Sequence, residues 1–184
     1  DLLRFNLLLL CLGCGVWSIG YAQGSLPEVT INEFMASNEH TILSSDFNEY
    51  ADWIELYNGG DSTAEISDFY LTDDLQDTMK WQIPADTRIR PGWTALFWAD
   101  SRNEGRHTSF NLNSGGEEIG FYSPAGILID SIRFTQQITD ISYGRYPDGT
   151  DNWFYFDNPT PVSSNSDPGY AGICGEPVFS TVGG

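Results

Sequence analysis

The fold is decided by residues 52–61, which read Asp52-Trp53-Ile54-Glu55-Leu56-Tyr57-Asn58-Gly59-Gly60-Asp61. The first seven residues alternate in the way expected of a β-strand with one buried face. Ile54 and Leu56 share the core face. Trp53, Glu55 and Tyr57 lie on the opposite face. The glycine pair that follows supplies the backbone freedom of a tight turn. This stretch therefore predicts a β-strand with an apolar core face and an aromatic and polar outer face, followed by a turn.

The rest of the chain repeats this rhythm of short apolar or aromatic runs separated by turn-forming residues. Such a rhythm is typical of a β-sandwich or barrel, and no helix of useful length is expected. The expected strands are Val29–Met35, Asp52–Asn58, Phe69–Thr72, Lys80–Ile83, Thr94–Ala99, Glu118–Tyr122, Ile127–Phe134, Ser142–Tyr146 and Trp153–Phe156.

The composition excludes several classes of partner. Lys and Arg number 8 against 26 Asp and Glu, so the formal net charge is −18. This charge repels phosphate backbones and anionic lipid headgroups, so binding to nucleic acid or to a membrane surface is not expected. Because 40% of the residues are hydrophobic, we interpret the acidity as the solvated surface of a folded domain.

Residues 1–22 have the anatomy of a secretory signal peptide. Arg4 precedes an apolar stretch over residues 7–19, and Gly20 and Ala22 place small residues at the cleavage site. The stretch is too short and too often interrupted by glycine to be a good membrane span. We therefore expect a mature protein that is secreted or held at the cell surface, without membrane insertion.

An alternative interpretation of the same segment is a lipoprotein signal with Cys14 acylated. Against it, Cys11 then occupies the −3 position, and the apolar run continues beyond the cut. Removal of the signal peptide leaves Cys174 as the one cysteine, so no intramolecular disulfide is expected.

The remaining boundaries follow from shifts in composition. We expect one folded domain over residues 27–165 and a linker rich in Ser, Asp, Pro and Gly over 166–176. Residues 177–184 begin with an apolar group, and the chain starts at Asp1 without Met. Both ends therefore look like cuts in a longer, multidomain protein, with 177–184 as the start of a further module.

Several segments of the chain, taken in order, resemble the bacterial lamin-tail domain. They are Thr30–Asn38, Asp52–Asn58, Phe69–Asp74, Lys80–Pro84, Leu96–Asp100, His107–Leu112, Ser142–Gly149, and Thr160-Pro161 with Asn165. The resemblance implies an immunoglobulin-like β-sandwich that bacteria use as a module of secreted or surface proteins, with no shared enzymatic activity. One departure is Val162, where such domains tend to carry glycine. Residues 175–184 resemble the opening of chitobiase C-terminal-like β modules, which implies that another domain follows.

Catalytic groups are scarce. The chain has two histidines, His40 and His107, and neither lies in a zinc-ligand pattern or beside a G-x-S-x-G nucleophile motif. We expect both to be solvent or turn histidines. Glu117 and Glu118 are adjacent, so on a strand they point to opposite faces and cannot form an acid/base pair. The chain is therefore not expected to be an enzyme.

Calcium is the one cofactor that the sequence suggests. Asp73, Asp74 and Asp77 follow one expected strand, with Asp68 before it, and clustered carboxylate oxygens are the ligands that calcium prefers. The competing interpretation is that a strongly acidic domain produces such groupings by chance.

Trp53 and Tyr57 are the candidate binding residues, because they share the strand face opposite Ile54 and Leu56. Exposed aromatic side chains on a β-sandwich form platforms for sugar rings or for partner proteins. In the competing interpretation they are core aromatics, and the long loop over residues 37–50 covers this face.

Asp130 shares its parity with the apolar side of the strand over 127–134. Either a bulge re-aims this carboxylate, or it is buried and bonded by backbone N–H groups. In both cases we expect a structural role.

Three functional hypotheses follow. The leading one is a non-catalytic, secreted or cell-surface interaction or spacer module of a larger protein, whose partner is a protein or a polysaccharide. The alternative is a carbohydrate-binding module accessory to an extracellular enzyme. The third is an enzyme fragment whose catalytic domain lies beyond Gly184.

Overall fold

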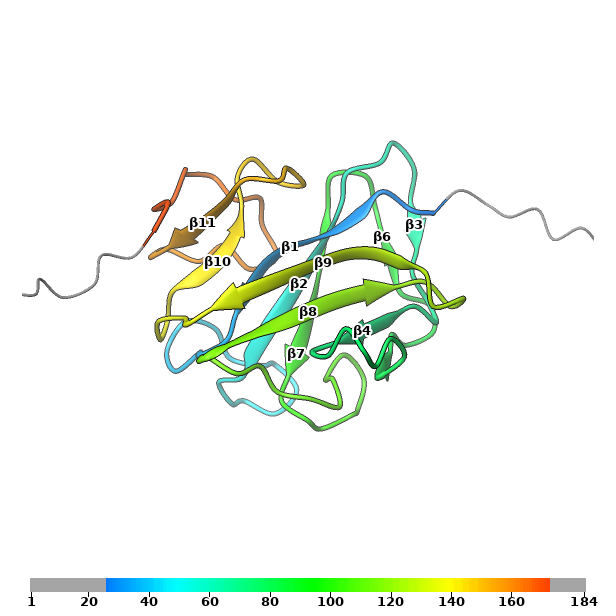
Figure 1. The fold of residues 1–184 in the computed structure, drawn as a ribbon, viewed down its shortest axis with the longest axis horizontal. Coiled ribbons are helices and arrows are strands. Elements are labelled where there is room, and N and C mark those ends of the chain that lie inside the picture. The colour runs from blue at the N-terminus through cyan, green and yellow to red at the C-terminus, as the bar shows by residue number, and fades with distance from the viewer. Residues whose placement is uncertain (1–25, 173–184) are drawn as a thin grey trace, which may run out of the picture.

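The computed structural model describes residues 26–172, and in this part of the chain it contains β-strands and no helix (Figure 1). The strands are β1 (Val29–Met35), β2 (Asp52–Asn58), β3 (Ala64–Glu65), β4 (Tyr70–Thr72), β5 (Trp81–Gln82), β6 (Arg88–Ile89), β7 (Thr94–Ala99), β8 (Gly116–Tyr122), β9 (Leu128–Thr135), β10 (Ser142–Arg145) and β11 (Trp153–Phe156). They form antiparallel sheets in the orders β11-β10-β1-β2-β7, β5-β4-β8-β9 and β3-β6. The predicted all-β, immunoglobulin-like sandwich is confirmed.

The main core lies between the two larger sheets. In Figure 1, β8 and β9 cross in front of β1, β2 and β7. Ile54 and Leu56 of β2 point into this core, as their alternation predicts, and meet Phe121 of β8 among the buried residues. Phe34 of β1 packs on Phe134 of β9 with ring centroids 4.5 Å apart. Burial of these large apolar side chains is the main force that joins the sheets.

The expected strands agree closely with those observed. The bounds of β1, β2, β7 and β11 coincide with the prediction, and the other expected strands differ by one or two residues at one or both ends. The two-residue strands β3 and β6 were not expected, because alternation cannot be recognised over so short a run.

Asp130 joins the two sheets at one edge of the sandwich. A register shift in β9 beside Asp130 forms a bulge, and the carboxylate reaches the first sheet, where it accepts a 2.8 Å hydrogen bond from the backbone N–H of Ile31. Arg145 of β10 donates to both Asp130 oxygens, at 3.1 and 2.9 Å, and to the carbonyl of Ile31 at 2.7 Å. The structural role predicted for Asp130 is confirmed.

After β11, residues 157–165 cross the outer face of the five-stranded sheet, and we call this segment the strap. The backbone N–H of Val162 donates to Glu55 of β2 at 2.5 Å, and the side chain of Asn165 donates to the carbonyl of Arg145 at 2.7 Å. Val162 has φ of 60°, in the left-handed region that favours glycine. A glycine at this position would adopt the same conformation without steric strain.

Part of the predicted linker lies against the sandwich. Tyr170 and Tyr155 of β11 exchange two backbone hydrogen bonds, of 2.9 and 2.8 Å, which cover the edge of the sheet. The predicted signal peptide over residues 1–22, the start of a further module over 177–184 and all three cysteines lie outside the described residues. Among residues 26–172, no helix is long and apolar enough to cross a membrane.

Candidate functional site

Trp53 is not an exposed platform residue. Its side chain is 0% exposed and packs in a second apolar cluster with Met35, Leu96 and Trp98 on the outer face of the five-stranded sheet. Ile42, from the loop after β1, packs against this cluster and helps to cover it. The prediction that Trp53 is exposed is therefore wrong, because the loop over residues 37–50 gains apolar burial by folding over the indole.

Tyr57 is half-buried and lies apart from the Trp53 cluster. A Cβ added to Gly149 would lie 3.1 Å from the Tyr57 ring, so the ring packs closely on that backbone. The ring lines a shallow hollow of about 460 Å³ together with Thr30, Ile129 and Asp148. The structure does not combine Trp53 and Tyr57 into one surface, and a binding role for Tyr57 alone stays a prediction.

The three aspartates proposed as calcium ligands do not converge. Asp73 forms an ion pair with Lys80, and Asp74 accepts a 2.9 Å hydrogen bond from the backbone N–H of Gln76. Asp77 meets Asp74 through backbone groups, with its N–H donating to the Asp74 carbonyl at 2.9 Å. Within residues 26–172, no three His, Cys, Asp or Glu side chains group as metal ligands would. Calcium binding by these residues stays an untested prediction.

Two buried carboxylates lie between the sheet and the strap. Glu33 of β1 and Glu55 of β2 are cross-strand partners, and both are fully buried. Glu33 accepts hydrogen bonds from the Ser142 hydroxyl at 2.5 Å and from the Thr160 N–H of the strap at 3.2 Å. Desolvation by burial raises the pKa of Glu33, and burial together with the nearby Glu33 carboxylate raises the pKa of Glu55 to about 8. These groups hold the strap to the sheet.

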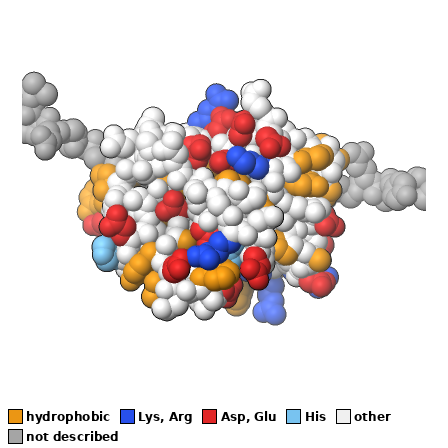
Figure 2. Space-filling model, turned by 90° about the horizontal axis from the view of Figure 1, so that it is seen from below, with side chains coloured by type: hydrophobic (Ala, Val, Ile, Leu, Met, Phe, Trp, Pro, Cys, Tyr) orange, Lys and Arg blue, Asp and Glu red, His pale blue; other side chains and the backbone are white. Residues whose placement is uncertain are grey.

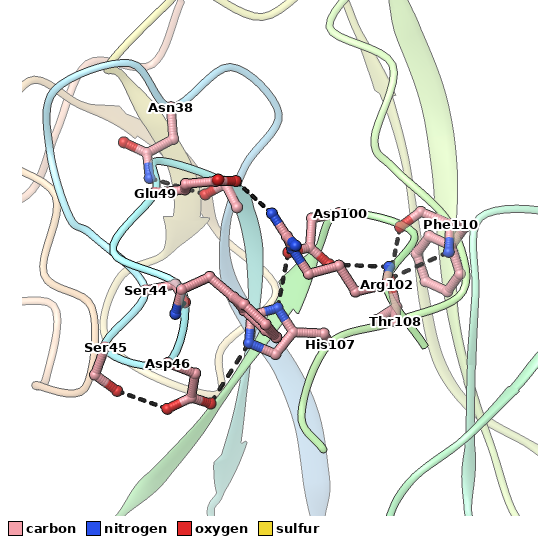
Figure 3. Close-up of polar contacts among 12 residues, drawn as sticks. Asn38, Ser44, Ser45, Asp46, Glu49, Asp100, Arg102, His107, Thr108 and Phe110 are labelled. Carbon is pink, nitrogen blue, oxygen red and sulfur yellow. Dashed lines mark hydrogen bonds and ion pairs between the residues drawn. The ribbon is translucent and has the colours of Figure 1, made fainter. Parts of the chain in front are cut away.

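His107 is the centre of a charged network that joins two loops (Figure 3). Its Nδ1 lies 2.7 Å from Asp100 Oδ2, and its Nε2 lies 3.6 Å from Asp46 Oδ2. The ring is 1% exposed, and the edge of Phe47 packs on it with centroids 4.7 Å apart. Of the two alternatives expected for His107, a solvent or a turn histidine, the structure bears out the turn, because its backbone N–H donates to the Glu104 carbonyl at 2.9 Å. Its ring is not in solvent, because it fills the space between the loop after β1 and the segment after β7.

Arg102 reinforces the same junction. Its Nε lies 3.1 Å from Asp100 Oδ2, its Nη2 pairs with Glu49, and its guanidinium lies 4.2 Å from the centroid of the Phe47 ring. The Ser45 hydroxyl donates a 3.0 Å hydrogen bond to Asp46, the carboxylate that lies beside His107 Nε2. The network therefore uses its charges to fix two loops together.

These loops present an open surface at one end of the sandwich. We define this loop face by Leu43, Tyr50 and His40, whose exposed side chains line a hollow of about 790 Å³ with Asn38, Glu39, Asn48 and Glu49. Figure 2 views the molecule from this end, where hydrophobic, basic and acidic side chains lie side by side. His40 is held in place by Asp140, because Asp140 Oδ2 lies 3.0 Å from His40 Nδ1. The loop face therefore combines exposed aromatic side chains with a fixed backbone.

The lamin tail domain model matches residues 22–136. The chain belongs to the lamin tail domain family. The match covers β1 to β9, whereas β10, β11 and the strap lie beyond it and complete the five-stranded sheet of this lamin tail domain. The lamin tail domain is a non-enzymatic, immunoglobulin-like fold. A search of curated proteins finds no significant match.

Sequence reasoning missed three features of this lamin tail domain. The glutamates Glu33 and Glu55 each sit in a strand that also carries predicted core residues, but alternation does not show that the strap returns over them. His107 is followed by a polar stretch that resembles a loop. Trp93, the most exposed tryptophan of residues 26–172, sits in a Pro-Gly turn, which was the available signal for its exposure.

Proposed function

We propose that this lamin tail domain is a non-catalytic interaction module that binds its partner through the loop face. The observation that carries the proposal is the buried His107 ring, which lies between Asp100 and the exposed Asp46 and joins two loops while Tyr50 and Leu43 remain exposed. Binding residues on β-sandwiches are commonly carried by loops on a rigid scaffold.

The loop face has the chemistry of a contact surface. Tyr50 is 44% exposed and Leu43 is 40% exposed, and the two residues are backbone partners in a small hairpin within the loop. A second backbone hydrogen bond, from Ser44 N–H to the Glu49 carbonyl at 2.9 Å, closes this hairpin. Because the loop is already ordered, binding incurs little additional loss of conformational entropy.

The cellular setting is part of the proposal. Residues 1–22 support export, and the resemblance at residues 175–184 supports attachment to a further module. The net charge of −18 disfavours anionic polymers, so the expected partner is a neutral polysaccharide or a protein at the cell surface.

The test is a paired assay of turnover and binding on the purified protein. We expect no hydrolysis of polysaccharide, peptide or nucleic-acid substrates, and saturable binding to one cell-wall or surface-protein fraction. The Leu43→Ala/Tyr50→Ala double variant should bind at least about tenfold more weakly, since exposed aromatic anchors carry much of an interface's energy. Leu128→Ala, which removes an equally exposed leucine from β9, is the matched control and should bind normally.

Two results would contradict this proposal. One is hydrolysis of a substrate that copurifies with the protein and persists in the double variant, while the double variant binds as strongly as the wild type. The other is equal affinity of the double variant and the control.

The assay is run with calcium and with a chelator. Loss of binding in the chelator would show that binding requires a divalent cation.

A further inference from the structure

Trp93 lacks a packing role within the described part of the chain. It is 61% exposed, whereas Trp53, Trp81 and Trp98 are buried and Trp153 is half-buried. An exposed indole leaves a large apolar face in water, which contributes nothing to the stability of the domain. The question is what this side chain contacts.

The turn that carries Trp93 is held rigidly. Arg90-Pro91-Gly92-Trp93 closes with a 3.0 Å hydrogen bond from Trp93 N–H to the Arg90 carbonyl, and Gly92 has φ of 70°, as a Pro-Gly turn requires. Buried Asn58 holds the turn from the side. Its N–H donates to the Trp93 carbonyl at 3.0 Å, and its own carbonyl accepts from Gly92 N–H at 2.8 Å. The indole is therefore presented from a preorganised backbone.

Arg90 lies over one face of the indole and leaves the opposite face open. Its guanidinium is 5.5 Å from the centroid of the Trp93 ring. Among the arginines of residues 26–172, Arg90 and Arg106 form no ion pair with a carboxylate, although the chain carries a net charge of −18. The donors of Arg90 thus remain free for another hydrogen-bonding partner.

The surroundings favour a sugar ring over a protein. Residues 90–93 are all exposed, and a Cβ added to Gly92 would meet nothing within 4 Å, so the turn projects into solvent. The neighbouring turn after Asn58 is polar, with Asp61 and Ser62 exposed. A protein interface surrounds its anchors with further packed residues, whereas one indole face and a few polar groups suffice for a pyranose ring.

We propose that Arg90 and Trp93 form a carbohydrate-contact site, the tip site, for a neutral polysaccharide. The C–H face of a pyranose ring packs on the Trp93 indole, and the Arg90 guanidinium donates hydrogen bonds to ring hydroxyls. The tip site precedes β7, whereas Asp100 of the loop-face network follows β7, so the two surfaces lie at opposite ends of one strand. The tip site therefore does not depend on the loop face.

The test is a depletion assay with the purified protein on phosphoric-acid-swollen cellulose and on colloidal chitin. We expect saturable, calcium-independent binding to at least one of them, weakened about thirtyfold in Trp93→Ala and about fivefold in Arg90→Ala. Trp93→Phe should retain intermediate affinity. Leu128→Ala, at an exposed position of β9 outside both surfaces, is the control and should bind like the wild type. Because Trp93 is exposed, the melting temperature of Trp93→Ala should stay within about 2 °C of the wild type.

Three outcomes would overturn the tip site. They are no binding of the wild type to either polysaccharide, equal binding by folded Trp93→Ala, and loss of a protein partner but of no polysaccharide in Trp93→Ala. Loss of polysaccharide binding in Tyr50→Ala with normal binding in Trp93→Ala would support the loop face and reject the tip site. The two proposals can therefore fail separately.

Discussion

The outer face of the five-stranded sheet is covered in two different ways. Around Trp53, the loop over residues 37–50 covers the sheet with apolar contacts. Around Glu33 and Glu55, the strap covers it with hydrogen bonds to buried carboxylates. Apolar burial does not depend on protonation, whereas a buried carboxylate is held in its protonated form by desolvation. One sheet face therefore carries a cover whose stability does not depend on pH beside a cover whose stability does.

The largest effect is expected at the apolar cover. Trp53→Ala removes a fully buried indole from the cluster with Met35, Leu96 and Trp98, so the free energy of unfolding should fall by about 3 to 5 kcal/mol. Urea denaturation measures it. Leu128→Ala, at an exposed position, is the control and should change stability by less than about 0.5 kcal/mol. A loss below about 1 kcal/mol for Trp53→Ala would mean that the loop does not cover this cluster.

The carboxylate cover should respond to pH. The pKa of Glu55 is raised from 4.5 to about 8 in the folded protein, so its contribution to stability is present below pH 4.5 and is lost as the pH rises through 8. Glu55→Gln cannot ionise. The free energy of unfolding of the wild type should fall between pH 5 and pH 9. In Glu55→Gln this fall should be smaller, by on the order of 3 kcal/mol.

Denaturation series at both pH values measure this difference, with exposed Glu104→Gln as the matched control. Parallel pH profiles for wild type, Glu55→Gln and Glu104→Gln would show that the Glu55 carboxylate is not buried under the strap in solution.

A smaller effect on the free energy of unfolding is expected at the buried His107, and almost none at the exposed His40. His107→Ala removes the buried ring between Asp100 and Phe47, so the free energy of unfolding should fall by about 2 kcal/mol. His40→Ala is the matched control, because its side chain is 75% exposed and its ion pair with Asp140 lies at the surface. Thermal denaturation compares them. Equal stability of the two variants would contradict the assignment of His107 to the loop junction.

The smallest effect is expected in the strap itself. Val162→Gly relieves the positive φ of a β-branched residue, so it should raise the free energy of unfolding by about 0.5 to 1 kcal/mol. Val162→Ala retains a Cβ and should give little of this gain. Chemical denaturation of both variants tests the point, and a destabilised Val162→Gly would show that the side chain contributes contacts that outweigh the backbone strain.

Much of the fold was predictable because β-strand alternation is a local signal. Ile54 and Leu56 identified the core face of β2 without any knowledge of their partners, and the parity of Asp130 correctly indicated a structural carboxylate, which is re-aimed by a bulge and bonded to a backbone N–H. Local signals do not show which segments from elsewhere in the chain cover a sheet face. The burial of Trp53 depends on Ile42, and that of Glu55 depends on Val162, which is 107 residues away in sequence.

The candidate site was less predictable for the same reason. His107 is buried by Phe47 and bonded to Asp100, and the spacing between these residues follows no motif. The exposure of Trp93 was also missed, although a Pro-Gly turn presents its neighbour to solvent by local geometry alone. Its prominence became clear only when the other described tryptophans proved to be more deeply packed.

We propose that the covered outer face is structural and that the loop face binds the partner. Hydrogen–deuterium exchange of the protein with and without its saturating cell-surface fraction distinguishes these roles. Bound partner should slow exchange in residues 37–51 and 100–111 and leave exchange in the strap over 157–165 unchanged. Protection confined to the strap and β10–β11, with no change in the two loops, would contradict this proposal.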